Sequence, residues 1–248
     1  MKILSAIGAS IVAALFLTST LIFAQTETET AESYVKQANT SVRHKSYNQA
    51  IDEYSMAIEL DPEYADAYYN RGISYSKIEQ YDLAIADFTK TLEINPEDID
   101  AYYKRGLTYV LKNENDEAID DFTNALKIDP KHVKALQSRG SSYANLKQYD
   151  EAIKDYDKVL VINPKDVNSY NVRAVIFKED KQYDKAIRDY DRLLQLKPDD
   201  ANTYYNRGQI YFLNMNNLTK GCSDLKKACE LGGLCKNYKI SLNKGDCS

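Results

Sequence analysis

Residue types that often carry catalysis are scarce in this chain. Its 248 residues include no Trp, two His, five Pro and nine Gly. The two histidines, His44 and His132, lie far apart in the sequence, so we expect them at the surface and not as a general base or as metal ligands. The glycines do not form a phosphate-binding loop. We therefore predict that the chain is not an enzyme and uses no metal and no cofactor.

An excess of positive charge is also absent. Lys and Arg number 32 against 37 Asp and Glu, and charges of both signs are interleaved along the chain. This argues against a nucleic-acid partner, because nucleic-acid binders gather basic residues into a patch. The 44% of hydrophobic residues rules out wholesale disorder. Tyr, at 21 residues, supplies most of the aromatic rings. Its hydroxyl suits half-buried positions between packed elements, where the ring is covered and the hydroxyl reaches water.

The long hydrophobic run of the chain stands at its N-terminus. Lys2 precedes an apolar stretch that ends at Ala24 and is followed by a polar linker, 25–30. This layout is typical of a secretory signal peptide, so we predict a signal peptide at 1–24 with cleavage after Ala24. If it were left uncut, the stretch is long enough to anchor the chain in a membrane. In both cases we expect the body of the chain outside the cytoplasm, periplasmic or secreted.

Cysteine is confined to the C-terminal end. The last 27 residues hold all four, Cys222, Cys229, Cys235 and Cys247. An even number of cysteines in an exported chain predicts two disulfides. A zinc site made of four thiolates is the competing interpretation. Disulfides are favoured because export brings oxidation and because the paired Cys-x-x-Cys spacing of zinc sites is missing.

The few prolines reveal an internal repeat. All five are spaced by 34 residues, at Pro62, Pro96, Pro130, Pro164 and Pro198. Small residues recur with the same period, at Gly72, Gly106, Gly140, Ala174 and Gly208. Within each unit, small and aromatic residues are spaced so that they share one face of each of two helices, and the proline ends the second helix. Because one helix pair cannot bury its apolar face alone, neighbouring pairs must stack into a solenoid.

The repeated unit resembles the tetratricopeptide repeat (TPR). The likeness is carried by Ala-Asp-Ala-Tyr-Tyr-Asn-Arg-Gly-Ile-Ser-Tyr at 65–75 and by the later Asn95-Pro96. The resemblance implies an all-α, right-handed α-solenoid of about six TPR helix-turn-helix repeats. From the cysteines we expect a disulfide-stapled capping segment at 233–248. The repeats are expected at 31–64, 65–98, 99–132, 133–166, 167–200 and 201–232.

A polar pattern keeps the same period. Arginines precede the small residues, at Arg71, Arg105, Arg139, Arg173 and Arg207. Acids precede the aromatic residue of each second helix, at Glu53, Asp87, Asp121, Asp155 and Asp189. We predict a ladder of Arg–carboxylate pairs, although the sequence does not say which acid each Arg chooses; a row of solvated charges is the alternative. The first repeat departs from the pattern, with Gln37 and Ser41 where the others favour Arg and Tyr.

The sixth repeat has one extra residue in its turn, 214–217, and is followed by the cysteine-bearing tail. Cys222 and Cys229 stand about 10 Å apart along one helix, too far to bond to each other. Each is expected to pair with the tail, and an antiparallel tail gives Cys229–Cys235 and Cys222–Cys247. The swapped pairing is the alternative. The disulfide-bonded tail would cover the apolar face of the sixth repeat, which a further repeat would otherwise cover.

The resemblance also implies where a partner lies. Family members hold partners on the inner surface formed by the first helices, which we call the inner face. Its variable positions include Asn39, Asp66, Tyr69, Asn70, Asp100, Tyr103, Lys104, Gln137, Ser141, Asn171, Asn202, Tyr205 and Asn206. Tyr and Asn suit protein contact; the alternative is a set of solvated helix faces. Some members grip a chain-terminal carboxylate, but Val35 and Asp100 stand where that grip needs Lys, so we do not predict it.

We therefore expect a non-enzymatic scaffold outside the cytoplasm that binds a protein or peptide partner in its groove. Two alternatives remain. One is a small-ligand or cell-wall glycan binding protein, or a hydrolase, that uses the Tyr-rich groove, although no paired carboxylate stands out from the repeated ones. The other is a structural spacer tethered by an uncleaved N-terminus, which is also the one way in which we expect membrane contact.

Overall fold

The computed structural model describes residues 30–235 and 247. The predicted signal peptide and most of the predicted capping segment lie outside the described residues. The chain divides into two compact units, 1–95 and 96–248. From residue 30 to residue 235 all regular elements are helices and none is a strand. Among these described helices, none combines the length and the apolar character that a membrane crossing needs.

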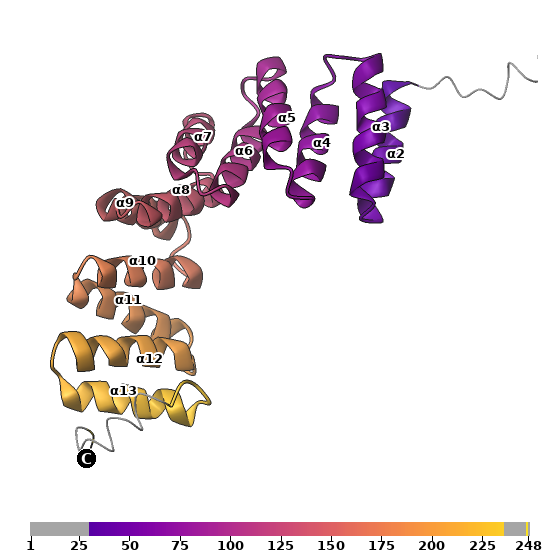
Figure 1. The fold of residues 1–248 in the computed structure, drawn as a ribbon. Helices are drawn as coiled ribbons and strands as arrows, with labels where there is room; N and C mark the ends of the chain where they lie inside the picture. The colour runs from indigo at the N-terminus through magenta and orange to yellow at the C-terminus, as the bar shows by residue number, and fades with distance from the viewer. Residues whose placement is uncertain (1–29, 236–246, 248) are drawn as a thin grey trace, which may run out of the picture. The chain divides into compact units, whose positions relative to one another are not determined.

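The first unit holds two helix pairs. Its helices are α2 (Ala31–Arg43), α3 (Tyr47–Leu60), α4 (Ala65–Lys77) and α5 (Tyr81–Ile94). Within the pairs α2 packs on α3 and α4 on α5, and the contact of α3 with α4 joins the two pairs (Figure 1). Thr30 caps the first of these helices, because its Oγ1 accepts a hydrogen bond from the Ser33 N–H at 3.1 Å.

The second unit holds four helix pairs. Its elements are α6 (Ile99–Leu111), α7 (Asn115–Ile128), α8 (Val133–Asn145), α9 (Tyr149–Ile162), α10 (Val167–Glu179), α11 (Tyr183–Leu196), α12 (Ala201–Gln209), the π-helix η1 (Ile210–Asn214) and α13 (Leu218–Glu230). From α6 to α13 each α-helix packs on the next, as the stack of α10 to α13 in Figure 1 shows. The predicted α-solenoid of tandem helix pairs is therefore confirmed.

Local sequence sets the helix bounds. The first helices of the second unit begin at capping side chains that accept from a backbone N–H three residues later, those of Asp98, His132, Asp166 and Asp200. The second helices of the first five repeats end two residues before a proline, α5 for example at Ile94 before Pro96. The residue before a proline cannot easily stay helical, so the repeated proline fixes the end of these five helices, as predicted.

The repeated small residue permits close approach of the two helices in a pair. A Cβ added to Gly106 of α6 would lie 2.7 Å from Phe122 Cε1 of α7, closer than real carbon contacts. The Phe122 side chain is fully buried against this bare backbone. The same position holds Ala174 in the fifth repeat, which is also buried. The predicted contact between small and aromatic residues is therefore present and tight.

The turn inside each of the first five repeats contains one residue in the left-handed conformation. These residues are Lys45, Glu79, Asn113, Lys147 and Lys181, with φ between 59° and 63°. The next residue returns a hydrogen bond to the helix end, as Gln80 N–H does to the Tyr75 carbonyl at 3.0 Å. Helices commonly close this way with glycine, and the sequence analysis missed these turns because no glycine stands at the position.

We expect Glu79→Gly to raise the free energy of unfolding by about 0.5–1 kcal/mol. The left-handed conformation costs an ordinary residue about 1–2 kcal/mol, and the greater freedom of an unfolded glycine offsets part of the gain. Glu79 is exposed, so the substitution removes little packing. Urea unfolding measures the change, and Glu79→Ala is the control, which should give no gain because alanine keeps the same backbone strain.

The extra residue of the sixth repeat is absorbed inside a helix. The sequence places it in the turn 214–217, whereas the structure forms the π-helix η1 just before that turn. Met215 N–H donates to the Ile210 carbonyl, five residues back, at 3.1 Å. Because a π-helical turn accommodates one more residue than an α-helical turn, the insertion leaves α13 in phase with the other second helices.

Candidate functional site

The repeated arginines form buried ion pairs with the second helix of their own repeat. Nε and Nη2 each donate to one carboxylate oxygen, at 2.7–2.8 Å, in the pairs Arg71–Asp87, Arg105–Asp121, Arg139–Asp155 and Arg173–Asp189. These carboxylate side chains are only 3–7% exposed. The predicted ladder is therefore confirmed for these four arginines, each of which takes the acid 16 residues after it, and the solvated row is excluded. Glu53, the first of the predicted acids, is not paired with Arg71, which takes Asp87 instead.

Tyrosine rings flank the arginines. The Arg71 guanidinium carbon lies 5.5 Å from the Tyr68 ring centre and 5.8 Å from that of Tyr75. Arg173 lies in the same way beside Tyr170 and Phe177, at 5.6 and 5.7 Å. Such cation–π contacts hold the guanidinium in place. The recurring aromatic positions of the first helices therefore serve the ladder as well as the core, a role that the sequence analysis did not assign.

Most of these arginines also reach the second helix of the preceding repeat. Arg71 Nη1 donates to Ser55 Oγ and Arg139 Nη1 to Thr123 Oγ1, each at 2.9 Å. In the later repeats the acceptors at this place are carboxylates, in the pairs Arg173–Asp157 and Arg207–Asp191. Each of these guanidinium groups thus joins three helices, which fixes the spacing of consecutive first helices and with it the geometry of the inner face.

Burial and pairing act against each other on the ladder groups. Burial lowers the pKa of the Arg71 guanidinium, but the hydrogen bond and charge of Asp87 reverse this and hold the pKa above its ordinary value. Burial raises the pKa of the Asp87 carboxyl, and the hydrogen bond from Arg71 offsets only part of that rise. Each of these two groups therefore stays charged in its partly buried position because the opposite charge of its partner lies beside it.

In the first unit, several predicted inner-face residues are already engaged. Asn39 Oδ1 accepts from the Tyr54 hydroxyl at 2.6 Å, and burial raises the pKa of Tyr54 to about 12. Asn70 Nδ2 donates to the Asp66 carbonyl at 2.8 Å. The ring of Tyr69 packs at 5.9 Å from that of Phe88. These side chains are positioned by neighbours before any partner arrives.

In the second unit the predicted residues lie on four successive first helices. Tyr103 and Lys104 belong to α6, Gln137 and Ser141 to α8, Asn171 to α10, and Asn202, Tyr205 and Asn206 to α12. Tyr103 packs on Phe122 at 5.8 Å and on His132 at 5.5 Å. His132 is thus a half-buried capping residue of α8, whereas His44 is exposed at the end of α2. Asn171 stays exposed, and Lys104 and Asn206 are half-buried.

Gln137 and Ser141 are fixed by hydrogen bonds. Gln137 Nε2 donates to Asp166, the capping residue of α10, and to Ser169 of the following repeat, both at 3.1 Å. Ser141 Oγ lies 2.7 Å from the Tyr156 hydroxyl. These bonds span two repeats, so the polar groups here hold one arrangement. A preorganised polar surface loses less entropy when a partner binds.

A pocket of about 180 Å³ lies beside these two residues, between α6 and α8. Its lining residues are Leu107, Val110, Gln137, Ser138, Ser141, Ser142 and Asn145. Ser142 Oγ is buried and is without a hydrogen-bond partner among the described residues. Leu107 and Val110 form an apolar wall, and neither was among the predicted inner-face residues. Two residues that were predicted, Gln137 and Ser141, lie at the rim of the same pocket.

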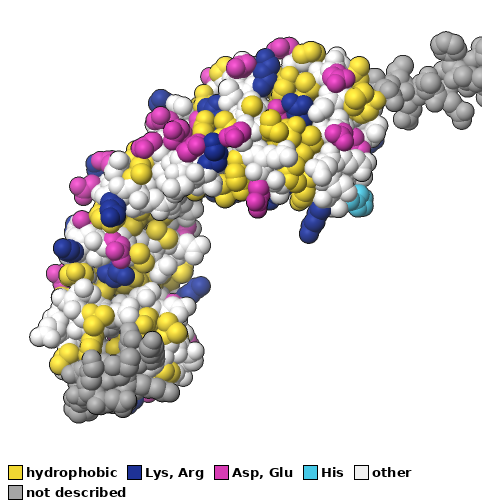
Figure 2. All heavy atoms as spheres, in the orientation of Figure 1, with side chains coloured by type: hydrophobic (Ala, Val, Ile, Leu, Met, Phe, Trp, Pro, Cys, Tyr) yellow, Lys and Arg dark blue, Asp and Glu magenta, His cyan; other side chains and the backbone are white. Residues whose placement is uncertain are grey.

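Charged side chains of the two signs are not separated into different regions on the face drawn in Figure 2. Lys, Arg, Asp and Glu side chains are interspersed over the face of the molecule drawn in Figure 2, as the interleaved sequence predicts. Among the described residues, no three His, Cys, Asp or Glu side chains are grouped so that they could hold a metal ion.

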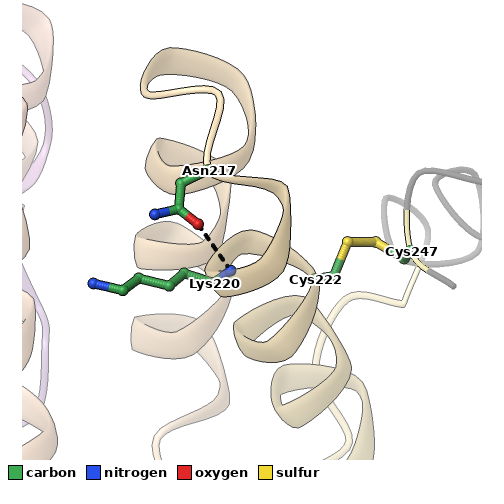
Figure 3. Close-up of a disulfide and its surroundings, with 4 residues drawn as sticks. All are labelled: Asn217, Lys220, Cys222 and Cys247. Atoms are coloured by element: carbon green, nitrogen blue, oxygen red, sulfur yellow. Dashed lines mark hydrogen bonds between the residues drawn. A yellow bond between two sulfur atoms is a disulfide. The ribbon is translucent and has the colours of Figure 1, made fainter.

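The sixth repeat closes the array with its own ion pair and a disulfide. Arg207 donates through Nε and Nη2 to Asp224 at 2.8 Å, and this acid stands 17 residues away because of the extra residue in η1. In Figure 3 the Asn217 side chain accepts from Lys220 N–H at 3.2 Å and caps α13, while Cys222 on the same helix is bonded to Cys247. Cys247 is only 6% exposed.

The structure joins Cys222 to Cys247 and Cys229 to Cys235, the pairs that an antiparallel tail predicts. The first bond closes a loop with a sequence separation of 25 and the second one of 6. We expect the double variant Cys222→Ser/Cys247→Ser to lose about 2–4 kcal/mol of stability, since the loss grows with loop length. The matched variant Cys229→Ser/Cys235→Ser should lose less.

Mass mapping of a non-reduced digest checks the pairing directly. Peptides that link Cys222 to Cys247 and Cys229 to Cys235 are the expected products. Free thiols throughout, or equal stability losses in the two double variants, would contradict the stapled end.

Sequence comparison matches family models over most of the chain. Models described as tetratricopeptide repeat match residues 65–98, 99–132, 133–166, 155–188 and 201–231. A model described as TPR repeat matches 42–78 and 175–214. Three of these matches have the same bounds as the repeats expected at 65–98, 99–132 and 133–166. Comparison with curated proteins gave no match.

Solved structures with a similar fold are numerous. A tetratricopeptide repeat protein from Parabacteroides merdae ATCC 43184 superposes with a TM-score of 0.70 at 24% identity, over 87% of each chain. YrrB, described as a TPR protein with an unusual peptide-binding site, gives 0.64 at 24% identity, over 77% of this chain and 97% of its own. The MamA protein gives 0.65 at 21% identity, over 69% and 94%. At these identities the likeness establishes the fold.

Proposed function

We propose, since the chain belongs to the tetratricopeptide repeat family, that it is a non-enzymatic scaffold outside the cytoplasm whose inner face holds an extended segment of a protein partner. The observation that carries this proposal is the pocket between α6 and α8, with its apolar wall and its fixed polar rim. The peptide-binding site of YrrB, a protein with the same fold, is in keeping with such a role.

The chemistry of the pocket favours a peptide. Its volume of about 180 Å³ suits one aliphatic side chain, which Leu107 and Val110 would contact. The amide of Asn145 and the hydroxyl of Ser138 stand at the same pocket and can bond to the N–H and C=O groups of an extended backbone. A peptide segment offers both kinds of group in alternation, which matches an apolar wall beside a polar rim.

Two disulfides support a place outside the cytoplasm, because disulfides persist in oxidising compartments. The N-terminal apolar stretch supports the same place through its signal-peptide layout. N-terminal sequencing of material recovered from the cell envelope tests this part of the proposal: a chain that begins at Gln25 supports it, and a reduced chain recovered with the cytoplasm contradicts it.

Site-specific photocrosslinking tests the binding surface. A photoreactive residue at Ser141, on the inner face, is expected to capture a protein partner in cell envelopes, and the same group at Lys154, on the exposed side of α9, is expected to capture none. Equal capture from both positions, or protection of Ser141 by a soluble cell-wall glycan instead of a protein, would contradict a peptide groove.

A further inference from the structure

The first repeat has the acid of a ladder pair without its arginine. Gln37 stands where the second repeat has Arg71, and Glu53 stands where that repeat has Asp87. The tyrosine that flanks the arginine on one side, Tyr75 in the second repeat, is replaced by Ser41. In the second repeat a guanidinium and a ring fill the space beside the acid. In the first repeat, the side chains at the same two positions are short or exposed.

The Glu53 carboxylate is held in position by hydrogen bonds from two neutral donors. Ser41 Oγ donates to its Oε2 at 2.7 Å, and Gln49 Nε2 donates to its Oε1 at 2.8 Å. Gln37 is exposed, so its side chain does not fill the place beside the acid. Each carboxylate oxygen has a second lone pair, so both can accept further hydrogen bonds.

A pocket of about 550 Å³ opens at this place between α2 and α3. Gln37, Ser41, Gln49 and Glu53 line it, together with Ser33, Lys36 and Thr40. Lys36 is the one positive charge in the lining and is exposed, so water screens its repulsion of a second cation. We call this pocket the empty rung.

We propose that the empty rung binds the guanidinium of an arginine presented by a partner protein. The later repeats show which group fits beside the acid between the two helices of a repeat. It is a guanidinium that donates two parallel hydrogen bonds to the carboxylate. Tyr34 stands at the sequence position that Tyr68, which flanks Arg71, has in the second repeat. Lysine fits less well because a single ammonium cannot donate the paired bonds.

A partner would approach the empty rung from the side where, in the second repeat, the preceding second helix supplies Ser55 to Arg71. Within the described residues no helix precedes α2. This binding is separate from the inner face and would hold even if the inner face bound nothing.

Titration by NMR tests the proposal with Nα-acetylarginine amide as the probe and Nα-acetylcitrulline amide as its uncharged counterpart. The arginine probe is expected to shift the amide signals of Ser41, Gln49 and Glu53 saturably, with a Kd of about 1–10 mM. The citrulline probe, which has the same length, is expected to bind at least tenfold more weakly. Equal effects of the two probes, or shifts that avoid these residues, would overturn the proposal.

Three variants separate the rung from general electrostatics. Glu53→Gln is expected to weaken binding of the arginine probe at least tenfold, while Asp52→Asn, which removes an exposed charge on the same helix, leaves it unchanged. Gln37→Arg fills the rung from within, so it should abolish probe binding and raise the Tm, and the gain in Tm should vanish when it is combined with Glu53→Gln. Equal losses in Glu53→Gln and Asp52→Asn, or unchanged probe binding in Gln37→Arg, would contradict the assignment.

Discussion

Replacing Arg139 by Ala is expected to lower the free energy of unfolding by about 3–5 kcal/mol. The substitution leaves the Asp155 carboxylate, whose side chain is 3% exposed, without the guanidinium that donates two hydrogen bonds to it at 2.7 Å. It also removes the bond to Thr123, which joins the repeat to the one before it. Denaturant unfolding followed by circular dichroism measures the loss.

Three further variants show whether the effect comes from the buried pair. Lys154→Ala breaks an exposed ion pair with Glu151 and should cost less than about 1 kcal/mol. Arg139→Lys should recover little, because an ammonium cannot make the two parallel bonds. The double variant Arg139→Leu/Asp155→Leu should recover much of the loss, since no unpaired charge remains buried. A loss in Arg139→Ala no larger than that in Lys154→Ala would show that the ladder contributes little.

Replacing Gly106 by Val is expected to cost about 2–3 kcal/mol. The added Cβ alone would come within 2.7 Å of the Phe122 ring, and the branched methyl groups add to the crowding. Phe122 is fully buried, so it cannot turn away without moving α7 relative to α6. Thermal unfolding of the variant should show a lower Tm.

The control places the same side chain where it meets no neighbour. Asn168→Val, at an exposed position of α10, should change stability by no more than about 0.5 kcal/mol. Combining Gly106→Val with Phe122→Leu should restore part of the stability, because the smaller side chain makes room. If Gly106→Val behaves like Asn168→Val, the close approach of the two helices does not limit the fold.

The sequence predicts the repeated architecture well because its signals are periodic. A proline spaced by 34 residues ends the second helix of each of the first five repeats, and a small residue faces a ring such as Phe122. Such features depend on contacts inside one repeat, and every copy provides the same evidence again. Helix geometry also predicts that Cys222 and Cys229 each bond to the tail and not to each other, but the structure is needed to choose Cys222–Cys247 over the swapped pairing.

Other features escape the sequence because they depend on three-dimensional distance. The acid that Arg139 chooses is decided by which carboxylate faces it across the pair, and both candidate acids satisfy the period. The left-handed turn at Glu79 has no glycine or asparagine to signal it. The apolar wall of Leu107 and Val110 becomes part of a site only when α6 and α8 lie side by side.

The bond between Cys222 and Cys247 determines from which end the array of repeats unfolds first. In a linear array of repeats, opening starts at an end, where a hairpin has one neighbour instead of two. The covalent link ties α13 to the C-terminal tail and so hinders fraying there, whereas α2 and α3 lack the Arg–carboxylate pair that joins the two helices of each later repeat. Native-state proteolysis should therefore trim the chain from its N-terminal hairpin inward, and successive fragments would share one intact C-terminal end.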